Sequence, residues 1–288
     1  MLISAATQPS TVCLFSSTSS EPLSLFSVST DQDLPSDSFV AHLHDRLSSP
    51  MPPSPRVLLK LPSFGHDDQE EASYRSSELD QTVLHIQSPT IRTTYIQSPP
   101  VFPPFAEINE REHGQPIGLG LKHPWMHLQV RNLGREWSFE TAIVDHAGRM
   151  GIIRFSTFQK APRLKLNRKK PGHPPLLLLP LSFPSHSSSR LTPWSIINVH
   201  FPSLLPWFSS PIIASGDREE DTQESPESRG WSSNALPNTS IIPSSVPTGT
   251  YSSVLYVRVY ANCRLRRIWF DEKSSANTDP WEFSLFSD

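Results

Sequence analysis

The stretch YANCRLRRIWFDE, residues 260–272, is a dense block of aromatic, aliphatic and basic residues near the end of a chain rich in serine and proline. Its arginines alternate with Leu265, Ile268, Trp269 and Phe270. Alternation of this kind is typical of a β-strand with one face inside a core, and a solvated tail has no reason to show it. We therefore predict a terminal strand in which both Trp269 and Phe270 are buried.

Alternating segments recur upstream of this block. The clearest is WSFETAIVD at 137–145, which the turn DHAG at 145–148 joins to RMGIIRFS at 149–156, so we predict a β-hairpin there. WMHLQVRNL at 125–133 and VLYVRVYA at 254–261 alternate in the same way. No segment has a sustained helical period. Many short strands at this spacing indicate an all-β fold, and we expect a β-sandwich.

Composition limits the kind of protein that this sequence encodes. It has 288 residues, of which 30 are proline, and a formal net charge of -3. That charge argues against a protein that coats nucleic acid, although local basic patches remain open. Its two cysteines, Cys13 and Cys263, cannot form a disulfide framework and indicate a reducing compartment. The longest apolar run, LLLLPL at 176–181, is too short for a membrane span, so we expect an intracellular protein with no membrane partner.

We expect a single domain that carries long disordered insertions. Tracts of serine, proline and acidic residues bury too little apolar surface to offset the entropy of ordering. The expected segments are N-terminal strands at 1–30, a disordered insertion at 31–76, the first part of the sandwich at 77–208, a disordered acidic insertion at 209–250, and C-terminal strands at 251–288.

The terminal block, preceded by LYVRV, resembles the signature of the cilia- and flagella-associated protein 20 family, in which Ala-Asn-Cys-Arg-hydrophobic-Arg-Arg forms a strand. Further segments resemble that family in the same order along the chain. They are CLFSSTSSEPLSLF at 13–26, TTYIQSP at 93–99, LGLKHPWMHLQVRNLGREWSFETAIVD at 119–145, RFSTFQKAPRLK at 154–165 and PWSIINVHF at 193–201. Extra segments at roughly 31–75, 97–117 and 209–250 depart from the compact members.

The resemblance implies a β-sandwich of jelly-roll type without catalysis. Family members are structural proteins at the junction between tubules of the ciliary doublet microtubule, where they contact tubulin. We therefore expect a non-catalytic scaffold with tubulin or another protein as partner, located in the cilium if the organism is ciliated and otherwise in the nucleus or cytoplasm.

Two alternatives remain open. The family's nuclear association allows a nuclear factor that binds proteins or nucleic acid with the same sandwich. Jelly-roll sandwiches also include carbohydrate-binding modules, which would need an exposed stacking platform built from tryptophans such as Trp125, Trp137, Trp194 and Trp269.

Two basic groups are the candidate partner-binding residues. The first consists of Arg163, Lys165, Arg168, Lys169 and Lys170. It fits the acidic tails of tubulin, a nuclear-import patch or phosphates, and the competing interpretation is a solvated loop.

The second basic group is Arg264 and Arg266, with Arg267 beside them. Strict strand alternation puts Arg264 and Arg266 on one face and Arg267 on the other, so the three are not expected to form one patch. The same alternation places Leu265, Arg267 and Trp269 together, opposite Arg266, Ile268 and Phe270. A structural role in which a carboxylate meets a guanidinium is the favoured interpretation.

The sequence gives no pattern for catalysis or metal binding. His123 and His127 stand four apart, but on an extended segment that separation is roughly 13 Å. The segment GLG at 118–120 lacks the rest of a dinucleotide loop, and no GxSxG motif is present. Cys263 fits a small buried hydrophobe better than a nucleophile. We expect no enzyme activity, no cofactor, no metal and no small-molecule substrate.

Overall fold

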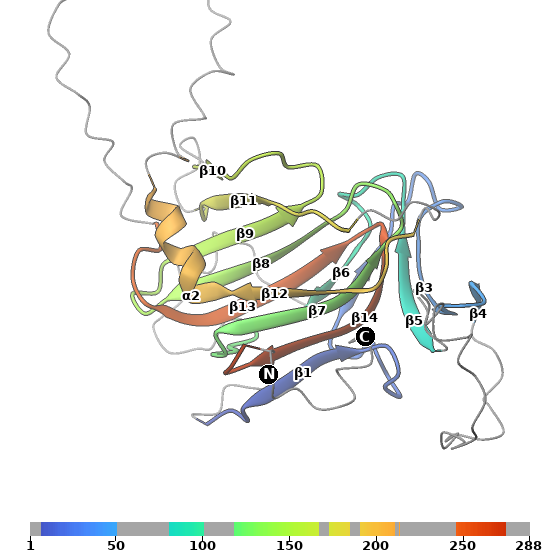
Figure 1. Ribbon diagram of the computed structural model, residues 1–288, viewed down its shortest axis with the longest axis horizontal. Coiled ribbons are helices and arrows are strands. Elements are labelled where there is room, and N and C mark those ends of the chain that lie inside the picture. Colours follow the sequence, from blue (N-terminus) through green and yellow to red (C-terminus); the bar gives the residue numbers. More distant parts are fainter. Residues whose placement is uncertain are drawn as a thin grey trace, which may run out of the picture.

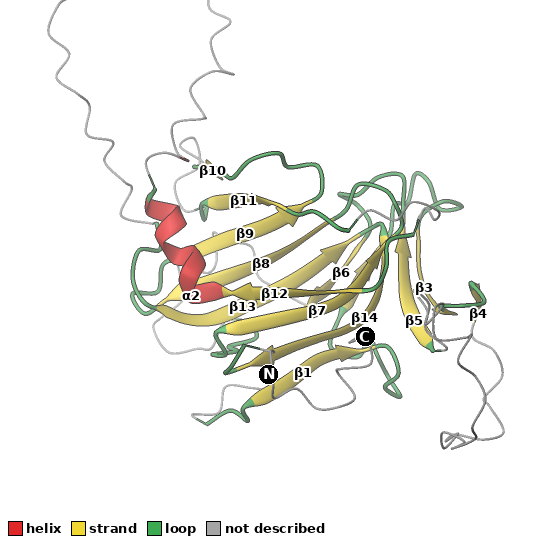
Figure 2. Cartoon of the chain, in the orientation of Figure 1, coloured by secondary structure: helices red, strands yellow, loops and turns green. Residues whose placement is uncertain are grey.

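The computed structural model describes residues 7–50, 81–100, 118–166, 173–184, 191–210, 213 and 246–274. In these residues strands and loops make up nearly all of the chain (Figure 2). The strands form two seven-stranded sheets, called sheet A and sheet B below (Figure 1). Sheet A contains β1 (Thr11–Ser16), β3 (Phe39–His44), β4 (Ser49–Pro50), β5 (Thr82–Gln87), β7 (Trp125–Asn132), β12 (Ser195–His200) and β14 (Cys263–Asp271). Sheet B contains β2 (Ser27–Ser29), β6 (Tyr95–Ser98), β8 (Ser138–Asp145), β9 (Met150–Ser156), β10 (Arg163–Lys165), β11 (Leu176–Pro180) and β13 (Tyr251–Tyr260).

Strand β14, from the C-terminal part of the chain, lies inside sheet A and pairs there with the N-terminal strand β1. The order of the sheet is β12-β7-β14-β5-β3-β4, and β1 also pairs with β14. On the side away from β7, β5 pairs with the first residues of β14 and β1 pairs with its last residues, all antiparallel. The terminal block is therefore an interior strand, as the sequence predicts.

Sheet B has the order β10-β11-β9-β8-β13-β6-β2. The expected hairpin is confirmed, because β8 and β9 pair antiparallel around the turn that follows Asp145. Strand β11 is parallel to β9, and the other pairings of this sheet are antiparallel.

One hydrophobic core fills the space between the two sheets. The inward residues of β7 are Met126, Leu128 and Val130, and those of β14 include Phe270, all with no exposed surface. Trp137 precedes β8 and is equally buried, and its indole N–H donates a hydrogen bond of 3.1 Å to the carbonyl of Tyr260. The alternation predicted along β7 and β8 is confirmed, and so is the all-β sandwich.

A short helical segment closes one end of the sandwich after β12 (Figure 1). It consists of α2 (Phe201–Leu204) and the 3₁₀ helix η2 (Leu205–Ser209). Phe208 packs against β9, where a Cβ added at Gly151 would lie 2.7 Å from the Phe208 ring. No helix among the described residues is both long and apolar enough to cross a membrane.

The burial of Trp269 and Phe270 is confirmed, but the face predicted for Leu265 is wrong. Neither side chain has exposed surface. Leu265 and Ile268 both belong to the core, although strict alternation would put them on opposite faces. The register of β14 against β7 shifts between Leu265 and Arg267. A β-bulge of this kind adds one residue to one strand and resets the alternation after it.

The disorder expected over residues 31–76 is wrong for residues 31–50. This part holds β3, which pairs with β5 over six residues, and β4, which pairs with β3. The rest of that insertion, from residue 51, lies outside the described residues, as does most of the insertion expected at 209–250. The apolar piece LSLF at 23–26 forms a turn, and β2 begins after it at Ser27.

Candidate interaction surface

A row of charged residues crosses the outer face of sheet B. Arg154 in β9 pairs with Glu140 in β8, Glu140 pairs with Arg258 in β13, and Arg258 pairs with Gln97 in β6. Directly paired residues lie on the same face of a sheet, so these side chains stand side by side. Their neighbours along each strand, such as Phe139 and Val259, point into the core instead.

Glu140 is the acidic centre of this row. Its carboxylate accepts hydrogen bonds from Arg154 Nε at 2.8 Å and Nη2 at 2.6 Å, from Arg258 Nη1 at 2.9 Å and from the Tyr256 hydroxyl at 3.1 Å. The Glu140 side chain is 2% exposed, whereas those of Arg154 and Arg258 are 32% and 27% exposed. Two guanidinium groups thus fix one buried carboxylate and keep part of their own surface toward solvent.

Three tyrosine rings surround Arg258. Its guanidinium carbon lies 4.7 Å from the ring centre of Tyr95, 5.5 Å from that of Tyr256 and 5.8 Å from that of Tyr260. Contacts at these distances are attractive cation–π interactions. Burial, and next the charge of Glu140, raise the pKa values of Tyr256 and Tyr260, so both hydroxyls stay protonated and can donate hydrogen bonds. The cluster is therefore a rigid surface of rings and guanidinium groups.

A groove of about 610 Å³ opens beside this cluster. Arg154 and Tyr260 form part of its wall, so the groove and the charged row share side chains. The residues that line it are Pro89, Thr90, Ile91, Arg92, Glu136, Ser138, Arg154, Phe158 and Tyr260. Arg92 and Glu136 are exposed, and Phe158 keeps 47% of its surface exposed. The groove thus offers two guanidinium groups, one carboxylate and an aromatic wall.

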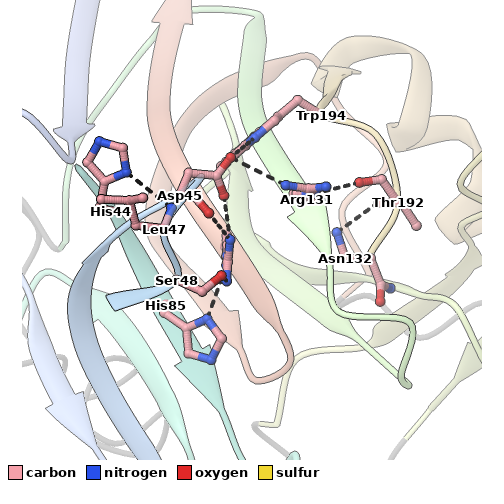
Figure 3. A network of polar contacts seen from close by, with 10 residues as sticks. His44, Asp45, Leu47, Ser48, His85, Arg131, Asn132, Thr192 and Trp194 are labelled. Atoms are coloured by element: carbon pink, nitrogen blue, oxygen red, sulfur yellow. Dashed lines mark hydrogen bonds and ion pairs between the residues drawn. The ribbon is translucent and has the colours of Figure 1, made fainter. Parts of the chain in front are cut away.

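A second polar cluster lies on the outer face of sheet A and is buried. Asp45, in the turn between β3 and β4, accepts hydrogen bonds from Arg264 Nη1 at 2.7 Å and from the Trp194 indole N–H at 2.8 Å, and an ion pair of 3.3 Å joins it to Arg131 (Figure 3). Arg264 also donates to the Asp45 carbonyl at 2.6 Å and to the Ser48 hydroxyl at 2.7 Å. Arg131 and Arg264 are directly paired neighbours in β7 and β14. Asp45 therefore separates two like charges that would otherwise repel each other.

The sequence of this chain is similar to sequences of known proteins. A family model described as the CFA20 domain matches residues 71–170. Cilia- and flagella-associated protein 20 of Chlamydomonas reinhardtii is 24% identical over 211 residues, which cover 73% of this chain and 76% of the relative. Residues 71–170 thus match the CFA20 domain, and most of the chain is similar to a protein of this kind, in agreement with the resemblance read from the sequence.

The stretch matched by the CFA20 domain model contains most of the groove. It runs from before β5 to the residues after β10, and it includes Arg92, Glu136, Glu140 and Arg154. Arg258 and Tyr260 come from β13, which lies beyond the matched stretch.

The structure separates the two basic groups predicted from the sequence. Arg163 and Lys165 lie in β10, and Arg163 is in register with Leu178, which is in register with Arg154. Arg163 thus lies on the groove's face of sheet B, two strands or about 10 Å from Arg154. Arg168, Lys169 and Lys170 lie outside the described residues.

The second basic group is buried within sheet A. Arg264 is 4% exposed and bound to Asp45, and Arg266 is 3% exposed, with Nη1 donating to Gln129 at 2.6 Å. Burial, together with the charge of Arg267, lowers the pKa of Arg266 to about 10. The carboxylate that meets Arg264 comes from a distant part of the chain. That partner, Asp45, is 219 residues away in the chain.

Of the four tryptophans considered for a stacking platform, two are fully buried, so these four do not form one exposed surface. Trp137 is in the core, and Trp269 is fully buried on the outer face of sheet A, where it stacks on His127 with ring centres 4.9 Å apart. Trp125 stacks on His200 at 4.4 Å and is half-buried.

The remaining candidates for chemistry take structural positions. Burial raises the pKa of the Cys263 thiol, and Cys263 has no exposed surface, as expected of a small core residue. Nε2 of His123 lies 2.7 Å from the Pro9 carbonyl, and Nδ1 of His127 lies 2.7 Å from the Asn198 side-chain oxygen. The described part of the chain holds no cluster of three or more histidine, cysteine or acidic residues suited to a metal ion.

The groove residues were not predicted from the sequence, although the cross-strand pairing of one of them, Arg154, could have been. The hairpin predicted around 145–148 fixes the pairing of Glu140 with Arg154, a typical cross-strand ion pair. Arg92 and Phe158 carry no such signal, because only the tertiary fold brings their loops to the same groove.

Proposed function

We propose that this chain is a non-catalytic structural protein of the cilium that binds tubulin or a neighbouring protein of the doublet microtubule. The proposal draws on similarity, over 73% of the chain, to a relative named as cilia- and flagella-associated. The structural observation that supports it is the groove on the outer face of sheet B, where the exposed Arg92 and part of Arg154 face solvent.

Protein binding fits the way in which charge is used in the fold. Asp45 and Glu140 each contact two guanidinium groups, and their side chains are 0% and 2% exposed. Neither carboxylate is placed to touch a substrate. The charged groups that reach solvent are the outer parts of the arginines, which suits the recognition of an acidic surface.

We propose that the basic edge of sheet B extends this binding face. Lys165 is exposed at the end of β10, and Arg163 shares the groove's face of the sheet. Together with Arg168, Lys169 and Lys170 they give the same sign of charge as Arg92 and Arg154. Attraction to the acidic tails of tubulin would then act over one side of the molecule.

Co-sedimentation with stabilised microtubules tests this function. The full chain is expected to pellet with microtubules at low salt, and the pelleted fraction should fall when salt is raised or when the acidic tubulin tails are removed by proteolysis. The chain spun without microtubules is the control. Failure to pellet at low salt with either kind of microtubule would rule out tubulin as the partner.

Localisation in a ciliated cell of the source organism separates the proposal from the nuclear alternative. A fluorescently tagged chain is expected along the cilium. A nuclear signal that is lost with Lys169→Ala and Lys170→Ala together would instead support nuclear import through the basic segment.

A further inference from the structure

We propose that the groove beside Arg92, Arg154 and Phe158 binds a glutamate side chain of an extended acidic peptide, together with a neighbouring apolar residue of that peptide. The choice of tubulin's acidic tail as the source of the peptide rests on the proposed function. The groove itself is argued from the residues that line it.

Two guanidinium groups in the groove have N–H groups to offer a carboxylate. Among the described residues, Arg92 makes no hydrogen bond or ion pair, and its side chain is exposed. Arg154 directs Nε and Nη2 to Glu140, which leaves Nη1 without a hydrogen bond to any described residue. Arginine recognises carboxylates through paired N–H donors, so both residues suit an incoming glutamate.

Arg154 is held in place before any ligand binds. Glu140 fixes its guanidinium from one side, and the guanidinium carbon lies 5.6 Å from the ring centre of Tyr260. Glu140 is itself fixed by Arg258 and Tyr256. A side chain that is already ordered loses little entropy on binding, which favours affinity.

The other lining residues favour a peptide over a nucleic acid. Glu136 places a hydrogen-bond acceptor in the same groove, which suits the backbone N–H groups of a peptide, whereas a sugar-phosphate backbone has no N–H to donate. Phe158 and Ile91 provide an apolar wall, and the exposed Phe158 ring offers a contact for an apolar peptide side chain.

Peptide binding to charge-reversed variants tests the groove. The probe is a fluorescently labelled peptide of six glutamates and one phenylalanine, measured by anisotropy at low salt with the full chain. Arg92→Glu is expected to weaken binding at least tenfold, because it removes one donor and adds a repelling charge. Arg92 has no partner among the described residues, so the variant should fold normally, which circular dichroism checks.

Arg135→Glu is the matched control. Arg135 is also exposed and lies next to Glu136 in the chain, but it does not line the groove. It makes the same change in net charge but removes no donor from the groove, so it should weaken peptide binding clearly less than Arg92→Glu does. Equal weakening by Arg92→Glu and Arg135→Glu would overturn the proposal, because it would mean general electrostatic attraction.

Glu136→Gln provides a test in the opposite direction. Removal of the groove's own carboxylate should strengthen peptide binding several-fold, and a weaker complex would contradict the arrangement. A labelled oligothymidine tested in parallel is expected to bind more weakly than the peptide. Tighter oligothymidine binding that Arg92→Glu abolishes would overturn the proposal in favour of a nucleic-acid groove.

The two proposals fail in different ways. If the chain pellets with microtubules and neither peptide binding nor pelleting responds to Arg92→Glu, the groove inference is wrong while the proposed function stands. If the peptide binds in the groove but the chain does not pellet, the groove inference stands. The natural ligand of the groove is then an acidic segment of a protein other than tubulin.

Discussion

Asp45 connects four parts of the chain that are far apart in sequence. Its carboxylate meets Arg131 from β7, Arg264 from β14 and Trp194 from the segment before β12. All of these groups are wholly or largely withdrawn from solvent, so each needs its partner. The turn that carries Asp45 is thereby fixed onto the outer face of sheet A.

Asp45→Asn is expected to lower the free energy of unfolding by about 3–5 kcal/mol, the cost of leaving buried charges without their counter-charge. Chemical denaturation of the full chain measures this change. Asp37→Asn is the control, since Asp37 is exposed in the same inserted part of the chain, and its effect should stay within about 0.5 kcal/mol. A loss of less than 1 kcal/mol for Asp45→Asn would show that the cluster adds little to stability.

His85 makes the same cluster sensitive to acid. Arg264 Nε donates to His85 Nδ1 at 3.4 Å, and His85 Nε2 lies 3.2 Å from the Gln87 side-chain oxygen. Burial is the main cause that lowers the pKa of His85, and the charge of Arg264 lowers it further, against an opposing hydrogen bond to Gln87. The free histidine pKa is about 6.5. As the pH falls below this value, the unfolded state therefore binds a proton at His85 before the folded state does.

Stability should accordingly fall as the pH drops from about 7 to 5, and His85→Gln should reduce that loss. The measurement is the free energy of unfolding at both pH values for the wild type and the variant. An identical loss in both proteins would contradict a contribution from His85.

At the scale of single residues, the sequence predicts which side chains are buried better than it predicts which residues they contact. The burial of Trp269 and Phe270 follows from local alternation, which one strand displays by itself. The partner of Arg264 could not be found in this way, because Asp45 lies in a segment whose composition indicates disorder. Long-range pairing of this kind depends on the tertiary fold.

Among the elements, β14 shows where alternation along the sequence fails to predict which face of the strand a residue occupies. The bulge between Leu265 and Arg267 brings Leu265 and Ile268 to the same core. No turn residue marks this bulge in the sequence, so the prediction that Arg264 and Arg267 lie on opposite faces was wrong. β8 and β9 have no such shift in their mutual pairing, and there the predicted hairpin is confirmed.

The segment before β7 shows a close approach that only glycine permits. Gly118 has φ +76°, and a Cβ added to it would lie 2.1 Å from the carbonyl oxygen of Leu255. That carbonyl accepts a hydrogen bond of 2.8 Å from Leu119, and Leu121 forms a bridge to Val254. Gly118 therefore allows this segment to lie along β13.

Gly118→Ala is expected to destabilise the fold by more than Gly148→Ala does. Both glycines have a positive φ, which costs alanine about 1–2 kcal/mol, but a Cβ at Gly148 would meet nothing within 4 Å. The clash at Gly118 should add about 1–3 kcal/mol, as overpacking does. Thermal denaturation compares the two variants, and equal losses would mean that the backbone contact with Leu255 relaxes freely.

Over the whole molecule, the two sheets use charge differently. On sheet A the ion pairs of Arg131 and Arg264 with Asp45 lie inside the fold, whereas on sheet B Arg154 and Arg258 stay partly exposed beside a groove. The sandwich architecture could be predicted from strand patterns and from the family resemblance. The groove could not, because it is assembled from loops and strands at 89–92, 136–138, 154–158 and 260.

Amide hydrogen exchange of the full chain, with and without stabilised microtubules, tests most directly the claim that sheet B is the binding face. We expect microtubules to slow exchange in the loop at 89–92 and around Phe158, and Arg92→Glu to abolish this protection. The outer strand β12 of sheet A should exchange at the same rate in both samples. Protection confined to sheet A, or none at microtubule concentrations that pellet the chain, would contradict the account.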